Sequence, residues 1–118
     1  MVLNYDIKAA TLVARPQAEI DHHTAERMRV QIDAAFEKSS CRHIVLDFTD
    51  VNFMDSSGIG MIIGRYKNAE KRGGKMALAG MSKEMTRLFT ISGLAKIIAQ
   101  ADTVEEAERL VNSRRDVV

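Results

Sequence analysis

Short β-rich runs alternate with helical patterns along the chain, and this alternation constrains the fold more than any other feature. In the first run, polar residues separate Leu3, Tyr5 and Ile7, which predicts a half-buried strand. Further strands are predicted at 11–14, 44–48, 76–79 and 96–99. The first two lie close enough together to form a hairpin. Two strands followed by helix–strand alternation indicate an α/β fold, with one mixed sheet of about five strands and about four helices packed on it.

Four helices are predicted from apolar spacing and from residues that cap helix ends. Asp21 is a predicted N-cap, and the residues that recur behind it at helical spacing are Ala25, Met28, Ile32, Ala35 and Phe36. The second apolar stripe, which we expect to face the sheet, consists of Ile59, Ile62, Ile63 and Tyr66. Ser82 caps a third helix, and Thr103 forms a capping box with Glu106 for a fourth. The 118 residues fit one core, so residues 1–118 are predicted to form one domain, with residues 113–118 frayed.

Composition excludes several classes of function. Seventeen basic and sixteen acidic residues leave a formal net charge of +1, so no basic excess attracts the whole molecule to nucleic acid. Cys41 is the single cysteine, which excludes an intramolecular disulfide and a cysteine-rich zinc site. The N-terminus lacks the features of a signal peptide, and the apolar runs are too short to span a membrane. We therefore expect a cytoplasmic protein with no nucleic-acid partner, no membrane span, no cofactor and no metal.

The segment Asp55-Ser56-Ser57-Gly58 follows a predicted turn at 49–52 and begins the second helix. Taken alone, these residues indicate ordinary capping, because Asp55 and the serines can accept backbone amide protons. A serine in the first helical turn is also a favourable place for a phosphate, since free amides and the positive helix end receive the added charge. Phosphorylation would add about −1.5 to −2 charge units to this surface and need not unfold the domain.

The face of the second helix opposite the predicted apolar stripe contains two glycines. The residues predicted on this face are Ser56, Ser57, Gly60, Met61, Gly64 and Arg65. A glycine in a helix interior costs about 1 kcal/mol relative to alanine. One explanation is that another chain must approach the backbone closely, with Met61 as an adaptable apolar contact. The other is that Gly60 or Gly64 packs tightly against an element of the same domain.

Several segments match a known family. Residues 19–26, 42–46, 53–60 and 64–67 closely resemble the anti-sigma factor antagonists with a STAS domain, and the resemblance continues through 87–89 and 92–94. The Asp-Ser-Ser-Gly turn occurs widely in such domains, whereas the segment at 21–26 is particular to the sporulation type. The chain departs from the family at Ala18, where glycine is usual, and at Pro16. The resemblance implies a single STAS domain over residues 1–118.

The resemblance also implies a cycle of partner switching. The unphosphorylated protein, expected to be a monomer when free, binds an anti-sigma factor and releases the sigma factor. That anti-sigma factor is itself a serine kinase with a histidine-kinase-like ATPase fold, and it phosphorylates Ser56, after which the complex dissociates. A serine phosphatase restores the active form. The expected partner-binding residues are Asp21, His22, Asp55, Ser56, Ser57, Gly58, Gly60, Met61, Gly64 and Arg65.

Other interpretations are less well supported by the residues. His22 and His23 beside Asp21 could suggest a metal, but neighbouring helical residues point about 100° apart and no further ligand cluster is evident. A serine hydrolase using Ser56 would need a base oriented toward it, and the Gly-x-Ser-x-Gly elbow is absent. The glycines lack the spacing of a phosphate-binding loop. Two alternatives stay open: a STAS module of another pathway, such as the general stress response, and a small hydrolase.

Overall fold

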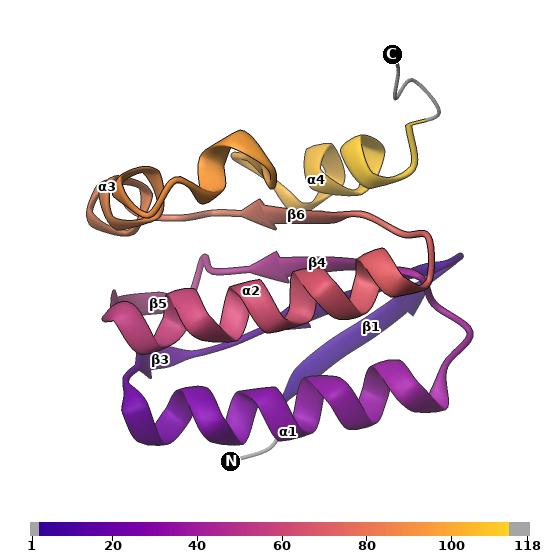
Figure 1. Cartoon of the computed structure of the whole chain (residues 1–118), viewed down its shortest axis with the longest axis horizontal. Coiled ribbons are helices and arrows are strands. Elements are labelled where there is room, and N and C mark those ends of the chain that lie inside the picture. Colours follow the sequence, from indigo (N-terminus) through magenta and orange to yellow (C-terminus); the bar gives the residue numbers. More distant parts are fainter. Residues whose placement is uncertain (1–2, 114–118) are drawn as a thin grey trace.

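The computed structural model describes residues 3–113 and shows a five-stranded mixed sheet with helices on both faces (Figure 1). The strand order is β1–β2–β4–β6–β7. β1 (Asn4–Lys8) and β2 (Thr11–Arg15) form the predicted antiparallel hairpin. The parallel strands that continue the sheet are β4 (His43–Asp47), β6 (Met76–Ala79) and β7 (Ala99–Ala101). The predicted α/β fold class is confirmed. Most of the segment expected to fray, residues 114–118, lies outside the described residues.

Two apolar cores cover the two faces of the sheet. Successive residues of a strand point to opposite faces, so one central strand serves both cores. The larger core lies under α1 (His22–Lys38), α2 (Ser56–Lys71) and α3 (Lys83–Ile91) and takes Leu12 and Ile44 from the sheet. The smaller core takes Val13 and Val45 and packs against α4 (Val104–Val111). Figure 1 shows α1 and α2 side by side on one face, away from α4.

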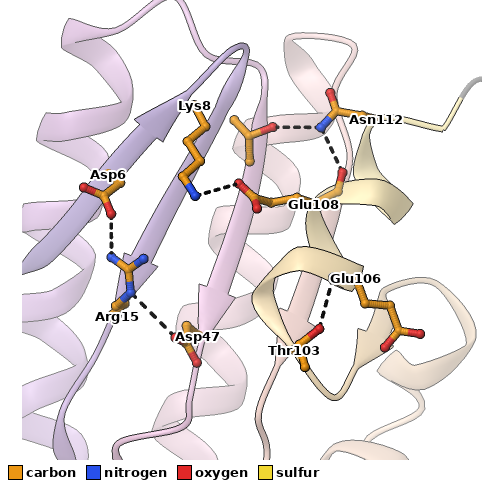
Figure 2. A network of polar contacts seen from close by, with 9 residues as sticks. Asp6, Lys8, Arg15, Asp47, Thr103, Glu106, Glu108 and Asn112 are labelled. Carbon is orange, nitrogen blue, oxygen red and sulfur yellow. Dashed lines mark hydrogen bonds and ion pairs between the residues drawn. The ribbon is translucent and has the colours of Figure 1, made fainter.

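Polar contacts on the second face tie α4 to the hairpin (Figure 2). Lys8 Nζ lies 3.9 Å from a carboxylate oxygen of Glu108 on α4. On the hairpin itself, Arg15 contacts Asp6 at 3.0 Å and Asp47 on β4 at 3.7 Å. Partly exposed ion pairs of this kind contribute on the order of 1 kcal/mol or less each, so packing of the smaller core holds α4 more than these charges do.

Two predictions about the edges of the sheet are wrong. β1 is exposed along its whole length, with Tyr5 43% and Ile7 50% exposed, rather than half-buried. It is an edge strand with a neighbour on one side only. The segment predicted as a strand at 96–99 contains the end of a short 3₁₀ helix, η1 (Leu94–Lys96), and β7 begins only at Ala99. Gly93, at φ 85°, provides the tight turn between α3 and η1.

The sequence did not predict a second, two-stranded sheet. β3 (Ala18–Ile20) pairs in parallel with β5 (Val51–Met54), a segment that begins inside the turn predicted at 49–52. Each strand leads directly into one of the two neighbouring helices, β3 into α1 and β5 into α2. This small sheet therefore fixes where both helices begin.

Candidate functional site

The N-termini of α1 and α2 lie next to each other because β3 and β5 run in parallel. Asp21 follows β3 and caps α1, and Asp55 follows β5 and caps α2. The backbone N–H of Asp55 donates to the carbonyl of Ile20 over 3.1 Å, which extends the pairing to the last residue before α2. The two predicted capping residues are thus held together, although they lie far apart in the sequence.

At the start of α1, Asp21 closes the helix end through its carboxylate. Its Oδ1 accepts from the backbone amides of His23 and Thr24, both at 3.0 Å, and Thr24 Oγ1 accepts in return from the Asp21 amide at 2.8 Å. The hydrogen bond from the Thr24 amide is the main cause that lowers the pKa of Asp21 below its ordinary value. Asp21 therefore stays ionised and keeps its capping role at neutral pH.

At the start of α2, the two serines occupy different environments. Asp55 Oδ1 accepts from the backbone amide of Ser57 at 2.8 Å. Ser56 is the first residue of the helix and its side chain is exposed, whereas Ser57 is half-buried. Asp55 thus acts as the helix cap through Ser57. Beside it, Ser56 offers an accessible hydroxyl at the start of the helix.

Gly58 was expected at the partner surface but is buried. A Cβ at this position would lie 2.4 Å from Cγ of Met54 and 3.2 Å from a methyl carbon of Ile20. Real Cβ atoms do not approach neighbours that closely, so only glycine lets α2 pack onto the two-stranded sheet without a shift of Met54. The glycine of the Asp-Ser-Ser-Gly turn thus serves internal packing.

A groove runs between α1 and α2 and brings together six of the ten expected partner-binding residues. These six are His22, Ser57, Gly60, Met61, Gly64 and Arg65. The groove is completed by three residues of α1 that were not predicted to bind a partner, Ala25, Glu26 and Arg29. Their spacing from His22 along α1, one turn for Glu26 and two turns for Arg29, is the signal that could have identified them.

Gly60 and Gly64 have no close neighbours in the described part of the chain. A Cβ added at either position meets no atom within 4 Å. The explanation that these glycines pack tightly inside the domain is therefore wrong. The explanation that another chain approaches the backbone here remains.

Met61 and Arg65 were expected on the exposed face, and this prediction is wrong. They are 4% and 6% exposed, and the buried stripe of α2 runs through Gly58, Met61, Ile62, Arg65 and Ala69. Ile59, Ile63 and Tyr66, expected to face the sheet, are only partly buried. α2 packs against α1 as well as the sheet, so its buried stripe is turned toward α1. The side chains of Met61 and Arg65 form the floor of the groove between α1 and α2.

Arg65 joins α2 to α1 through a partly buried ion pair with Asp33. Its Nε lies 2.8 Å from Oδ1 of Asp33 on α1, although the N–H does not point at that oxygen, and Nη1 donates to the Met61 carbonyl at 3.3 Å. Asp33 Oδ1 also accepts from Asn68 at 3.1 Å. Burial lowers the pKa of Arg65 from its ordinary value, and the negative charge of Asp33 opposes this effect. The guanidinium stays charged and fixes the spacing of the two helices.

The described residues offer no metal site in this region. The rings of His22 and His23 meet edge to face with centroids 5.4 Å apart, and within residues 3–113 no group of three or more His, Cys, Asp or Glu side chains could hold a metal ion. None of the helices in this same range is long and apolar enough to cross a membrane.

Comparisons with known proteins agree with this geometry. The model of the STAS domain family matches residues 3–107. The anti-sigma F factor antagonist of Paenibacillus polymyxa is 45% identical over 87 residues, 74% of each chain, and the anti-sigma-B factor antagonist of Bacillus subtilis is 34% identical over 83% of this chain and 90% of the relative. The structure of unphosphorylated SpoIIAA superposes with a TM-score of 0.79 at 32% identity and 99% coverage of both chains. The chain therefore belongs to the STAS domain family, among the anti-sigma factor antagonists.

Proposed function

We propose that this protein is an anti-sigma factor antagonist whose binding to an anti-sigma factor is switched off by phosphorylation of Ser56. The observation that carries the proposal is the position of Ser56, an exposed hydroxyl in the first turn of α2. It lies one turn before Gly60 on the same helix face and beside the groove between α1 and α2. A kinase can reach the hydroxyl from solvent, and a partner covering the groove must cover it too.

The open glycines give the binding surface its shape. With no side chain at Gly60 or Gly64, a partner can contact the backbone of α2 directly. His22 and Glu26 on α1 face the groove from its other side. Asp21 and Asp55 support this surface from behind as helix caps. The partner therefore meets polar and charged groups around a floor formed by Met61 and the guanidinium of Arg65.

A phosphate on Ser56 would act on the complex much more than on the fold. In the first helical turn, an added anion is stabilised by about 0.3–1 kcal/mol. In an interface fitted to a neutral hydroxyl, the same charge is buried without a counter-ion and costs several kcal/mol. The phosphorylated protein would thus stay folded and release its partner. A relative, SpoIIAA from Bacillus, has been solved in a phosphorylated form and is 33% identical to this chain.

The partner in this proposal is an anti-sigma factor that is also a serine kinase, and a phosphatase reverses its action. We base the choice of the sporulation pathway over the general stress response on the segment at 21–26. Identity does not separate the two pathways, because two anti-sigma F factor antagonists are 45% and 33% identical to this chain and two anti-sigma-B factor antagonists are 34% and 38% identical. Binding measured against both types of anti-sigma factor from the same organism would distinguish the two pathways.

Phosphorylation by the anti-sigma factor tests the proposal. The wild-type protein is incubated with the purified anti-sigma factor of the same organism and ATP, then examined by tandem mass spectrometry. We expect one phosphate, on Ser56. The control variant Ser57→Ala should still be phosphorylated, whereas Ser56→Ala should not. A phosphate on Ser57 alone would refute the assignment of the site, and the absence of both binding and phosphate would refute the proposed function.

A further inference from the structure

Phe53 lies on the surface although it occupies a strand position that alternation would bury. Val51 and Met54 of β5 are 5% and 7% exposed, whereas Phe53 is 51% exposed. On a regular strand, side chains two positions apart point to the same side of the sheet. Val51 and Phe53 should therefore both face inward. The observed order along β5 is instead buried, exposed, exposed, buried.

An irregularity in the pairing of β3 and β5 causes this outward turn. Val51 pairs with Ala18 and Phe53 pairs with Glu19, so the register skips Asn52. One extra residue reverses the faces of all residues that follow it. Met54 therefore enters the core, and the ring of Phe53 points to solvent. On β3, Ala18 completes the irregularity with a φ of 65°, a left-handed conformation that alanine adopts at a cost.

These features are uncommon, and they occur together next to the candidate site. Extra residues in parallel strand pairs are rare, and they often re-aim a side chain beside a functional site. The result here is an exposed aromatic ring where a regular strand would bury it. Phe53 itself lies outside both cores of the described residues, whereas the same irregularity places Met54 in the larger core.

Phe53 is close enough to Ser56 to share its partner. Three residues of chain span at most about 11 Å, and a standard interface covers roughly 800 Å² of each protein. The ring of Phe53 is therefore within reach of a partner that holds the hydroxyl of Ser56. Aromatic residues are enriched at the centres of interfaces and dominate their binding energy.

We propose that Phe53 is an apolar anchor that inserts into an apolar cavity of the anti-sigma factor, beside the place where that kinase takes Ser56. This inference rests on the proposed function. A neutral Ser56 adds no further charge beside this apolar contact. A phosphate at Ser56 would bring water and charge to the edge of the ring, so the loss of this contact adds to the effect of phosphorylation.

The test is isothermal titration calorimetry with the purified anti-sigma factor of the same organism and four forms of this protein: wild type, Phe53→Ala, Phe53→Leu and Val30→Ala. Val30, on α1, is also 51% exposed and serves as the matched control. Phe53→Ala should weaken binding by about 30-fold or more, Phe53→Leu less, and Val30→Ala should leave it unchanged. Melting curves should show that all four forms are folded. If Phe53→Ala lowers the melting temperature, Phe53→Thr, with a residue favoured in strands, takes its place.

The outcomes separate this inference from the proposed function. If wild type binds and Phe53→Ala binds equally tightly, Phe53 is not an anchor, and the proposed function stands. Equal losses in Phe53→Ala and Val30→Ala would also overturn the inference, because the effect would not be specific to the ring. If wild type itself does not bind the anti-sigma factor, the proposed function fails and this inference fails with it.

Discussion

Ala18 begins β3 with a φ of 65°, and its replacement by glycine should stabilise the protein. Contacts with neighbouring residues hold the backbone of Ala18 in this left-handed conformation. The Ala18 amide donates to the Asp50 carbonyl at 2.9 Å, and the next residue, Glu19, begins the shifted register with β5. An L-residue in the left-handed region costs about 1–2 kcal/mol because its Cβ approaches the backbone carbonyl. Glycine avoids this clash.

The expected gain is smaller than the full cost of the strain. Glycine loses more conformational freedom on folding, which offsets about 0.5–1 kcal/mol. The net stabilisation of Ala18→Gly should therefore be about 0.5–1 kcal/mol. For a domain of this size, such a gain raises the melting temperature by about 2–5 °C. Urea denaturation measures the free energy of unfolding, and the midpoint should rise with an unchanged slope.

Two other alanines provide matched controls for this measurement. Ala9, in the hairpin loop between β1 and β2, has a φ of 55°, so Ala9→Gly should also stabilise the protein. Ala34 is exposed in the middle of α1, and Ala34→Gly should destabilise it by about 1 kcal/mol. If Ala18→Gly destabilises the protein as much as Ala34→Gly does, the backbone at Ala18 carries no strain. That result would refute the conclusion that β3 begins with a strained residue.

Three further predictions concern the site and the core. Ser56→Asp should keep or slightly raise the melting temperature but weaken binding of the anti-sigma factor by about 100-fold or more in calorimetry. Ser56→Ala should bind normally, and if Ser56→Asp binds as tightly as wild type, local charge repulsion is not the mechanism of the switch. Gly64→Leu should abolish binding with unchanged circular dichroism and an equal or higher melting temperature, since an added Cβ meets no atom within 4 Å and leucine favours a helix interior more than glycine does; an unfolded variant would contradict this. His43 Nδ1 accepts the Lys75 amide at 3.0 Å, and burial, followed by the charges of Arg42 and Lys75, lowers the pKa of His43. The contribution of neutral His43 to the free energy of unfolding is complete above the ordinary histidine pKa of about 6.5. It is lost as the pH falls through the lower pKa of His43 in the folded protein, and the free energy of unfolding then decreases by at most about 1.4 kcal/mol per pH unit. Urea denaturation at about pH 7.5 and pH 5 should show this loss in wild type but not in His43→Asn, and the same loss in both would exclude His43 as its origin.

Features decided by nearby residues could be predicted from the sequence. The N-caps Asp21, Ser82 and Thr103 act as predicted, since each side chain accepts an amide two or three residues ahead. The capping box at Thr103 forms only in part, because Glu106 accepts the amide of Asp102. All five apolar residues predicted along the first helix are buried.

Features decided by partners far along the chain could not be predicted. The pairing of β3 with β5 joins residues about thirty positions apart and involves strands of three and four residues, too short to show a clear period. The turn of α2 toward α1 depends on Asp33, whose attraction for Arg65 no helical pattern reveals. Consequently the sequence identified most of the groove but misplaced Met61 and Arg65 on its outer face.

Several features that lower the stability of the fold lie along α2 and on the two short strands that lead into α1 and α2. Gly60 and Gly64 each cost about 1 kcal/mol in a helix interior, and the left-handed Ala18 costs about 1–2 kcal/mol. Phe53 forgoes burial, which would contribute about 1.5–3 kcal/mol. A domain is stable by only about 5–15 kcal/mol, so these losses are large. The core around Leu12, Ile44 and Leu78 shows none of them. Phe53 and Gly60 lie within four residues of Ser56 along the chain, so a demand for binding explains these two better than a demand for folding.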